Sequence, residues 1–333
     1  MPLWYTLPMA ACYRLIELLA DGDFHSGETL GERLSMTRTA VWKQVRQLEK
    51  LGLDVHAVRG RGYRLPYRLE LLDRDRIQSQ LSPVVLRRLH RLDLFHDIDS
   101  TSDYLKRECV PMPGGRGHAC LAEWQHAGRG RRGRRWVSPY GSNLYLSLAW
   151  GFEGGLENLS GLSLAAAVAV LRALRKAGIE GAGLKWPNDI LLGGGKLAGI
   201  LLDMAGEASG PVTVVVGVGV NVHMPGPAGV DIDQPWSDLS QYADSLSRNR
   251  LAALLLDELV GAMEEFSEHG LPGFLDEWQQ HDLINGQEIR LHVGDRVLHG
   301  LACGVDAQGA LIMRDASGVR RYHAGEVSVR LNA

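Results

Sequence analysis

A segment of interleaved arginine and glycine, residues 125–136, restricts what the middle of this chain can fold into. Its sequence is Gln-His-Ala-Gly-Arg-Gly-Arg-Arg-Gly-Arg-Arg-Trp, with five arginines, three glycines and almost no apolar surface. Glycine costs backbone entropy and adjacent like charges repel, so we predict a mobile loop rather than a helix or a packed strand. Guanidinium groups suit carboxylate and phosphate oxygens, and a glycine-rich backbone can close tightly over an anion. The segment alone leaves two interpretations open: a loop that binds an anionic ligand, or a solvated basic loop that touches nucleic acid.

Length and composition place the chain among ordinary globular proteins. It has 333 residues, of which 45% are hydrophobic and 23% charged, and its formal net charge is −3. This length is sufficient for two or three domains, and any nucleic-acid surface must be local because the chain is not basic overall. The four cysteines are scattered without metal-type spacing, which fits a reducing cytosol and predicts no metal site. The first residues do not resemble a signal peptide and no apolar run could span a bilayer, so we expect a cytoplasmic protein with no membrane segment.

The N-terminal segment, residues 1–66, has the pattern of a winged helix-turn-helix domain. We predict three helices, the last two capped by Ser26 and Thr37, and two short strands, at 10–20, 26–34, 38–51, 54–58 and 63–65. Between residues 38 and 64 there are seven basic residues and two acidic ones. The candidate DNA contacts lie on the third helix and in the turn between the strands: Arg38, Thr39, Lys43, Arg46, Arg59 and Arg61. A helical protein-interaction module is the alternative.

Two further segments follow a linker at Pro66 and Tyr67. Residues 67–282 mix helices with strands, which predicts an α+β domain with a mostly antiparallel or mixed sheet. Its expected elements are a helix at 162–176, a hairpin of strands 184–192 and 196–203, a strand at 211–222 and a helix at 251–266. For residues 283–333 the pattern predicts a small β-barrel that is too small for its own active site. Its expected strands are at 287–293, 296–306, 310–314, 320–323 and 327–331.

Two motifs with lysine and aspartate flank the hairpin turn. Lys185-Trp186-Pro187-Asn188-Asp189 precedes it and Lys196-Leu197-Ala198-Gly199 follows it. Alternation along the second strand predicts that Lys196 shares a face with Ala198 and Ile200, while Leu197, Gly199 and Leu201 lie on the opposite face. Lys196 could bind a carboxylate or phosphate, and Gly199 would leave room for a ligand. Asp189 could orient an incoming amine, hold a cation or simply cap a turn; Trp186 and Pro187 are expected to pack.

Other motifs indicate binding without covalent catalysis. Gly217-Val218-Gly219-Val220-Asn221 is a weak dinucleotide fingerprint, but its glycines would let a flat ligand lie against a strand, with Asn221 as a polar contact. Asp99-Ser100-Thr101-Ser102 could bond a polar ring or cap a helix. The sequence has no P-loop, no nucleophile elbow and no Cys/His zinc set. Phosphoryl or nucleotidyl transfer needs none of these, because it depends on cations and positioning.

Together these motifs resemble the bacterial biotin–protein ligases, specifically the bifunctional kind that also represses the biotin operon. Residues 125–134 resemble that family's biotin-binding loop, residues 185–189 and 196–199 resemble two further signatures in the same order, and the resemblance covers nearly the whole chain. It implies a multidomain α+β protein, with an N-terminal winged helix-turn-helix, a central α+β ligase domain with a mixed sheet, and a C-terminal small SH3-like β-barrel. The alternatives are a lipoate–protein ligase, a ligand-sensing repressor that has lost catalysis, and a ligase with a vestigial winged helix.

The resemblance also implies a two-step reaction and a regulatory use of its intermediate. Biotin attacks the α-phosphate of Mg-ATP to give biotinyl-5′-AMP and pyrophosphate, and a lysine of a biotin carboxyl carrier protein, expected in acetyl-CoA carboxylase, then displaces AMP. With the same adenylate bound as corepressor, the protein would form a homodimer on operator DNA.

The resemblance assigns roles residue by residue. Those implied for biotin are Ser100, Thr101, Gln125, Gly128, Arg129, Arg131, Lys196 and Gly199. Those implied for the adenylate or ATP are Arg132, Arg134, Asn221 and Trp236, the last with flanking residues that match only loosely. Arg131 and Lys196 are the expected catalytic cations, and Asp189 is expected to assist the acceptor lysine.

Overall fold

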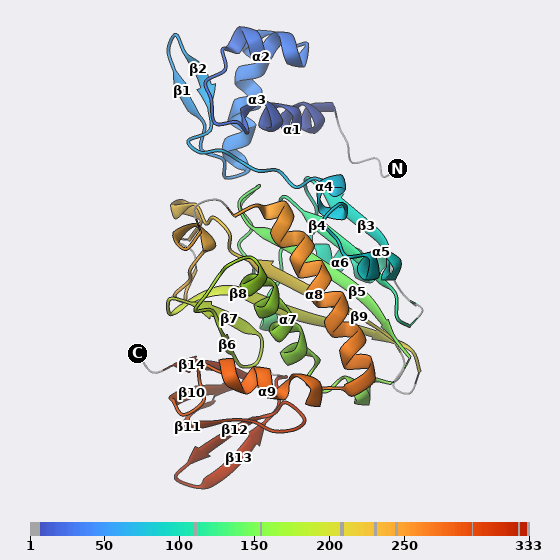
Figure 1. Ribbon diagram of the computed structural model, residues 1–333. Coiled ribbons are helices and arrows are strands. Elements are labelled where there is room, and N and C mark those ends of the chain that lie inside the picture. Colours follow the sequence, from blue (N-terminus) through green and yellow to red (C-terminus); the bar gives the residue numbers. More distant parts are fainter. Residues whose placement is uncertain are drawn as a thin grey trace.

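Three domains follow one another along the long axis of the molecule (Figure 1). The computed structural model describes residues 7–108, 112, 114–153, 155–206, 210–229, 232–243, 246–294, 296–325 and 327–331. The N-terminal helices lie at one end, a large sheet covered by helices lies in the middle, and a small sheet lies at the other end. Within this described part of the chain, no helix combines the length and apolarity that a bilayer crossing requires.

The N-terminal domain has the predicted order of elements. It contains α1 (Leu7–Leu19), α2 (Gly27–Leu34), α3 (Arg38–Lys50), β1 (His56–Val58) and β2 (Gly62–Arg64). The Ser26 hydroxyl accepts a hydrogen bond from the Thr29 backbone N–H at 3.0 Å, and that of Thr37 accepts one from Ala40 at 3.2 Å. These bonds satisfy backbone donors that have no partner at a helix start, so the two predicted N-caps are confirmed.

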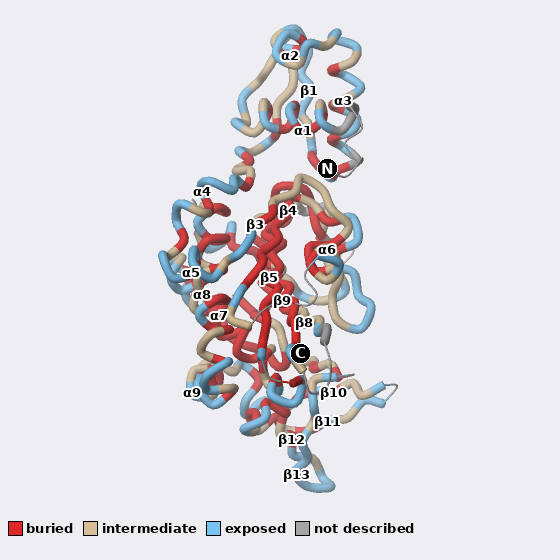
Figure 2. Tube along the Cα trace, turned by 90° about the vertical axis from the view of Figure 1, so that its right-hand side faces the viewer, coloured by how far each residue is buried: buried red, intermediate tan, exposed pale blue. Residues whose placement is uncertain are grey.

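The central domain is built on a mixed seven-stranded sheet, as predicted. Its strand order is β3 (Leu89–Phe95), β4 (Gly117–Ala122), β5 (Leu144–Phe152), β9 (Val212–Val220), β8 (Gly195–Gly206), β7 (Asp189–Leu192) and β6 (Gly183–Lys185). Only the β3–β4 pair among these neighbours is parallel. Figure 2 shows buried residues concentrated along β5 and β9, in the middle of the sheet. These strands are apolar on both faces because helices cover both sides of the sheet.

The helices of the central domain enclose this sheet. On one face α7 (Leu162–Lys176) packs against α8 (Arg248–His269), and α6 (Thr101–Glu108) lies on the other face (Figure 2). The remaining helices are α4 (Arg74–Gln78), α5 (Pro83–Arg88), α9 (Pro272–His281), and the 3-10 turns η1 (Arg131–Gly133), η2 (Leu156–Leu159), η3 (Gly226–Gly229) and η4 (Leu239–Gln241). The predicted bounds of α7 are confirmed, whereas α8 extends beyond its predicted 251–266 at both ends.

Two predictions about the hairpin are wrong. Residues 184–192 do not form one strand, because β6 and β7 are separate antiparallel strands with Lys185 opposite Asp189 and a turn between them. Pro187 lies in that turn, where its missing N–H is not needed for a ladder. Lys196 also does not share a face with Ala198: the β7–β8 register shifts at this point, and a Cβ built on Gly199 would lie 3.0 Å from Lys196 Cε. The bulge adds one residue to β8 and turns Lys196 to the Gly199 side.

The C-terminal domain is a five-stranded antiparallel sheet. It contains β10 (Glu288–Val293), β11 (Arg296–Val305), β12 (Leu311–Asp315), β13 (Gly318–Tyr322) and β14 (Val327–Leu331), in the order β13-β12-β11-β10-β14. The predicted strands are confirmed to within two residues at each end. Their closure into a barrel stays a prediction.

Candidate functional site

The arginine-rich segment forms a tight hairpin-like loop. The Trp136 N–H donates to the Gly128 carbonyl at 2.9 Å, and the Gly130 N–H donates to the Arg134 carbonyl at 2.7 Å. At the tip, Arg132 and Gly133 have φ values of 59° and 71°. The left-handed conformation suits glycine and is uncommon for arginine, so the tip is a constrained turn. The absence of a regular helix or packed strand is as predicted, and the mobility of the loop stays a prediction.

A cavity of about 610 Å³ lies between this loop and the central sheet. Its lining includes every residue predicted for biotin, adenylate or catalysis except Gly128: Ser100, Thr101, Gln125, Arg129, Arg131, Arg132, Arg134, Asp189, Lys196, Gly199, Asn221 and Trp236. Gly128 lies at the base of the loop, where a Cβ would come within 2.8 Å of the Trp136 carbonyl oxygen. Residues from positions 100 to 236 therefore converge on one site.

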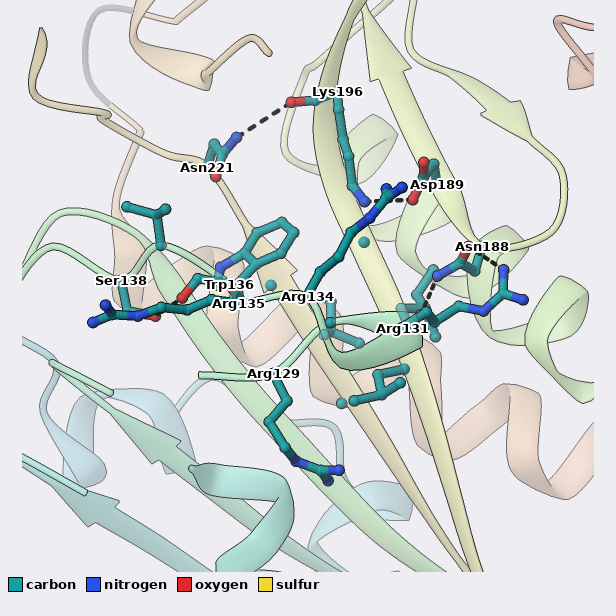
Figure 3. A pocket seen from close by; sticks show the side chains of 18 of the residues that line it. Arg129, Arg131, Arg134, Arg135, Trp136, Ser138, Asn188, Asp189, Lys196 and Asn221 are labelled. Carbon is teal, nitrogen blue, oxygen red and sulfur yellow. Dashed lines mark hydrogen bonds and ion pairs between the residues drawn. The ribbon is translucent and has the colours of Figure 1, made fainter. Parts of the chain in front are cut away.

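Lys196 and Asp189 form an ion pair at the wall of this cavity. The Lys196 Nζ lies 2.6 Å from Asp189 Oδ1, and the Lys185 Nζ lies 3.9 Å from Asp189 Oδ2. Asp189 therefore faces two ammonium groups, one from β6 and one from β8. Burial lowers the pKa of Lys185, although the charge of Asp189 opposes this shift. Figure 3 shows Arg134 reaching from the loop toward the same pair.

Arg131 reaches a different set of acceptors. Its Nη1 donates to Asn188 Oδ1 at 3.1 Å, and its Nη2 donates to the carbonyls of Ala324, Gly325 and Val327, the last two at 3.0 and 3.3 Å. Burial lowers the pKa of Arg131, with Asp189 opposing this effect. Neutral carbonyls are weaker partners for a guanidinium than an anion is, so a carboxylate or phosphate in the cavity would compete for Arg131.

Arg129 belongs to an ion network at the edge of the cavity. Its guanidinium pairs with Asp103 at 3.0 Å and with Asp203, and Lys106 lies within 3.1 and 3.7 Å of the same two carboxylates. In Figure 3 the Arg129 side chain points away from Lys196. The network fixes one end of the arginine loop to α6 and β8.

Ser100, Thr101 and Gln125 meet in a buried polar corner. The Gln125 Oε1 accepts hydrogen bonds from the Thr101 N–H at 2.9 Å and from the Thr101 hydroxyl at 3.1 Å. The Thr101 hydroxyl also lies 2.8 Å from the Ser147 hydroxyl. The Ser100 hydroxyl accepts from the Asp103 N–H at 3.4 Å, so the helix-cap interpretation of this motif is confirmed for Ser100. Buried hydroxyl and amide groups in this arrangement suit a small polar ring.

Gly219 on β9 and Gly199 on β8 leave room for a flat group, and in the structure that group is the indole of Trp136. A Cβ on Gly219 would lie 2.4 Å from Trp136 Cε2, and one on Gly199 would lie 3.1 Å from its Cζ3. The Lys196 Nζ lies 5.5 Å from the indole centroid, within the range of a cation–π contact. Trp136 therefore forms one wall between the polar corner and the Lys196–Asp189 pair.

Asn221 and Trp236 lie beside the Lys196 backbone. The Asn221 Nδ2 donates to the Lys196 and Ser237 carbonyls at 3.2 and 3.1 Å, while its buried Oδ1 has no hydrogen-bond partner within the described residues. Trp236 pairs with Lys196 in a short parallel bridge. An unpaired buried acceptor is costly, so Asn221 Oδ1 is suited to a donor on a ligand.

The six basic and hydroxyl residues predicted to contact DNA lie outside this cavity. Arg38, Thr39, Lys43 and Arg46 are exposed on α3, and Arg59 and Arg61 are exposed in the turn between β1 and β2. The guanidinium of Arg61 lies 4.1 Å from the Phe24 ring centroid, which holds that side chain against the domain.

Comparison with known proteins decides the family. Residues 94–221 match the biotin/lipoate A/B protein ligase family, residues 13–64 match an HTH domain, and residues 285–330 match the biotin protein ligase C terminal domain. The bifunctional ligase/repressor BirA of Salmonella typhimurium is 42% identical over 316 residues, which cover 95% of this chain and 96% of that protein. This chain belongs to the family of bifunctional biotin ligase–repressors. The BirA of Escherichia coli strain K12 is 40% identical over 317 residues, again 95% and 96% of the two chains.

A solved structure agrees with the ligase assignment. The biotin protein ligase from Aquifex aeolicus in complex with biotin and ATP has a TM-score of 0.60 at 25% identity, covering 74% of this chain and all of that one. The family resemblance and the fold class predicted from the sequence are therefore confirmed.

Several residues of the ligase site were not found from the sequence. Trp136 ends the arginine segment and Asn188 precedes Asp189, so both had a signal in their neighbours. Ser328 and Arg330 line the cavity from β14, and the Arg132 Nη1 donates to the Ser328 hydroxyl at 3.3 Å. No local pattern in the sequence connects β14 with a loop almost two hundred residues earlier.

Proposed function

We propose that this ligase–repressor attaches biotin to a lysine of a biotin carboxyl carrier protein through biotinyl-5′-AMP. The observation that carries the proposal is the meeting of Arg131, Arg134 and Lys196 with Asp189 and a buried polar corner in one cavity. The polar corner would bind the ring of biotin through Ser100, Thr101 and Gln125. Its carboxylate would then extend past Trp136 toward Lys196.

In the first step, the cations would remove the repulsion between two anions. A carboxylate that attacks an α-phosphate is opposed by Coulomb repulsion, which is stronger in a water-poor cavity than in bulk solvent. Lys196 and the loop arginines offer preorganised positive charge where negative charge develops, and this lowers the barrier without a covalent nucleophile. The biotin carboxylate oxygen bonds to the α-phosphorus as the bond to pyrophosphate breaks.

ATP would enter as its magnesium complex. No cluster of three or more His, Cys, Asp or Glu side chains suited to a metal occurs among the described residues. When bound with ATP, the magnesium ion would supply positive charge to the phosphate oxygens. Asn221 and Trp236 would contact the nucleotide, Asn221 through its unpaired Oδ1 and Trp236 through its ring.

In the second step, Asp189 would prepare the acceptor lysine. An ammonium group cannot attack, because its lone pair is occupied by a proton. Asp189 lies at the cavity wall and can orient the incoming amine once Lys196 has turned to the phosphate. The ammonium first loses one proton to solvent beside Asp189, and the neutral amine then bonds to the biotinyl carbonyl carbon. The bond from this carbon to the phosphate oxygen breaks, AMP leaves as an anion, and the nitrogen loses a second proton to solvent.

The same adenylate would act as corepressor. We propose that it favours a homodimer in which two copies of the N-terminal domain contact operator DNA, a geometry typical of helix-turn-helix repressors. We place the boundaries of the ligase domain at residues 66 and 282. We place the reaction in the cytoplasm, where ATP and free cysteines are both found. Equilibrium sedimentation with and without biotinyl-AMP tests the dimer, and unchanged self-association would contradict it.

Modification of a purified carrier domain tests the ligase directly. The full chain is incubated with biotin, Mg-ATP and the carrier domain, and streptavidin detects the product. We expect biotin on the carrier with the wild type and none with Lys196→Met, which removes the ammonium but keeps most of the side-chain volume. A carrier that stays unmodified by the wild type would contradict the proposal.

A further inference from the structure

The third helix of the N-terminal domain presents a large apolar side chain to solvent. Trp42 lies on α3 and is 48% exposed, whereas Val41, Val45 and Leu48 of the same helix are buried in the N-terminal core. Single exposed apolar residues are common and need no explanation by themselves. Trp42 differs from other exposed apolar residues because it lies among the candidate DNA contacts of α3.

Trp42 lies within the face that carries the candidate DNA contacts. Residues three and four apart are neighbours on a helix, so Arg38 and Thr39 lie one turn before Trp42 and Arg46 lies one turn after it. The Arg46 guanidinium carbon lies 5.6 Å from the indole centroid, and Arg46 is itself paired with Glu49 at 3.0 Å. The cation–π contact and the ion pair together restrict the orientation of the ring.

We propose that Trp42 reads base edges in the major groove, which rests on the DNA-binding function proposed above. The N-terminal part of a recognition helix reaches the base edges, and Trp42 lies little more than one turn after the cap at Thr37. Contacts of Lys43 and Arg46 with phosphate would fix the register of the helix but carry no sequence information.

The indole has the chemistry for base readout. It offers an apolar surface to the C5 methyl group of thymine and one N–H donor to a base acceptor. Thr39, its neighbour one turn earlier, carries a methyl and a hydroxyl that can contact the same groove. Trp42 therefore determines specificity at a position that contains thymine, while the surrounding cations supply affinity.

The test separates specificity from affinity. The full-length wild type, with biotin and Mg-ATP present, selects duplexes from a pool with a randomised core, and its binding to a selected duplex and to a scrambled duplex is then measured over a range of salt concentrations. Trp42→Ala should lower the preference for the selected duplex about tenfold while leaving the salt dependence unchanged. The matched control Lys43→Ala should weaken both duplexes by a similar factor and reduce the salt slope by about one.

The outcomes distinguish this inference from the function on which it rests. If the wild type selects no duplex, the DNA-binding function itself fails and the inference fails with it. If the wild type selects a duplex and Trp42→Ala keeps its preference within twofold, only the inference is wrong. Equal loss on both duplexes, together with a lowered unfolding temperature, would mean that Trp42 is structural. Trp42→Phe keeps an apolar ring and should regain part of the preference.

Discussion

The two small domains are joined to the ligase domain in different ways. The C-terminal sheet shares one apolar core with the ligase domain, in which Ile289, Leu291 and Met313 pack together with residues of α7 and α8. The N-terminal domain has a core of its own, which takes in only a few residues beyond position 66, such as Leu69 and Tyr140. The C-terminal domain is thus part of the catalytic body, whereas the N-terminal domain is a separate body fixed to it at defined points.

The points of attachment on the N-terminal side are aromatic and polar. The Tyr13 hydroxyl donates to Asp97 Oδ2 at 3.0 Å, and its ring stacks on His96 with 4.5 Å between centroids. His126, the neighbour of Gln125, hydrogen-bonds the other Asp97 oxygen at 3.3 Å. Leu51 and Gly52, which follow α3, line the ligase cavity. Asp97 therefore connects the N-terminal domain indirectly to the base of the loop that would bind biotin.

On the C-terminal side the contact with the loop is direct. Arg131 is bound to the carbonyls that precede and begin β14, and Trp186 Nε1 donates to the Gly309 carbonyl at 3.0 Å. Both contacts connect a segment that lines the cavity directly to the backbone of the C-terminal domain. The difference between the two junctions leads to four predictions.

The largest effect should come from removing one small domain or the other. Deletion of residues 283–333 exposes apolar side chains of the shared core, each worth about 1.5–3 kcal/mol of burial, so we expect residues 1–282 to be insoluble or unfolded. Residues 67–333 should fold and keep ATP–pyrophosphate exchange. Circular dichroism and exchange assays on both fragments check this, and a folded, active 1–282 fragment would show that the cores are independent.

The second-largest effect, on the free energy of unfolding, should follow from breaking the buried Arg248–Glu123 ion pair beside the segment that follows the linker. Arg248 Nη2 lies 2.8 Å from Glu123 Oε2, with both side chains at most 5% exposed, and the Glu123 Oε1 accepts from the Leu72 N–H. Glu123→Ala leaves the buried Arg248 guanidinium without a charged partner, although it still donates to the carbonyls of Glu70 and Asn143. The variant should therefore lower the free energy of unfolding by about 3–5 kcal/mol. The control Glu264→Ala breaks the partly exposed pair with Arg88 and should cost about 0–1 kcal/mol. Urea unfolding measures both, and equal losses would contradict the difference.

Next in size is the loss of Arg131 from the loop. Arg131→Gly removes a group that ties the loop to the C-terminal sheet and would bind the adenylate, so the variant should still make biotinyl-AMP but release it about 10- to 100-fold faster. Rapid gel filtration of radiolabelled intermediate measures the release. Arg135→Gly removes the same charge from an exposed position of the same loop and serves as the matched control. Retention by Arg131→Gly equal to that of the wild type would show that the loop does not close through Arg131.

The smallest effect concerns the N-terminal junction. Tyr13→Phe keeps the stack on His96 but loses the hydrogen bond to Asp97, which should cost about 1 kcal/mol. The reactivity of the neighbouring Cys12 thiol can be used to detect loosening of this junction. Burial raises the pKa of this thiol to about 11, so the thiol should become more reactive when it is exposed. At pH 8 only about one native Cys12 thiol in a thousand is ionised, and its reactivity should rise with pH until the pH reaches this raised pKa.

Alkylation followed by peptide mass spectrometry measures this reactivity. Cys12 should react far more slowly than the partly exposed Cys303 in the wild type, and faster in Tyr13→Phe than in the wild type. A native Cys12 as reactive as Cys303 would show that Cys12 is not protected by burial at the junction between the N-terminal domain and the ligase domain.

Local chemistry explains what could be predicted from the sequence. The caps Ser26 and Thr37, the apolar helix α7 and the short C-terminal strands depend on neighbours along the chain, and their predictions are confirmed. The sequence prediction missed the turn at Pro187 and the bulge before Gly199, because both depend on the register of β7 against its partner strands. That register cannot be derived from strand alternation alone.

The contacts between domains had no local signal at all. Tyr13 meets Asp97, and Arg131 meets the backbone beside β14, only because the folded domains bring distant segments together. The predicted roles of the individual cavity residues stay predictions until ligands are bound. The family resemblance predicted that these residues would meet in one cavity. Sequence periodicity alone could not have brought Ser100 and Trp236 together.

ATP–pyrophosphate exchange on the purified full-length chain, with biotin and lipoate compared as the carboxylate, tests the central claim most directly. The account predicts exchange with biotin, none with lipoate, and loss of the biotin signal in Lys196→Met. No exchange with biotin, or exchange with lipoate alone, would contradict the assignment of this cavity to biotin adenylation.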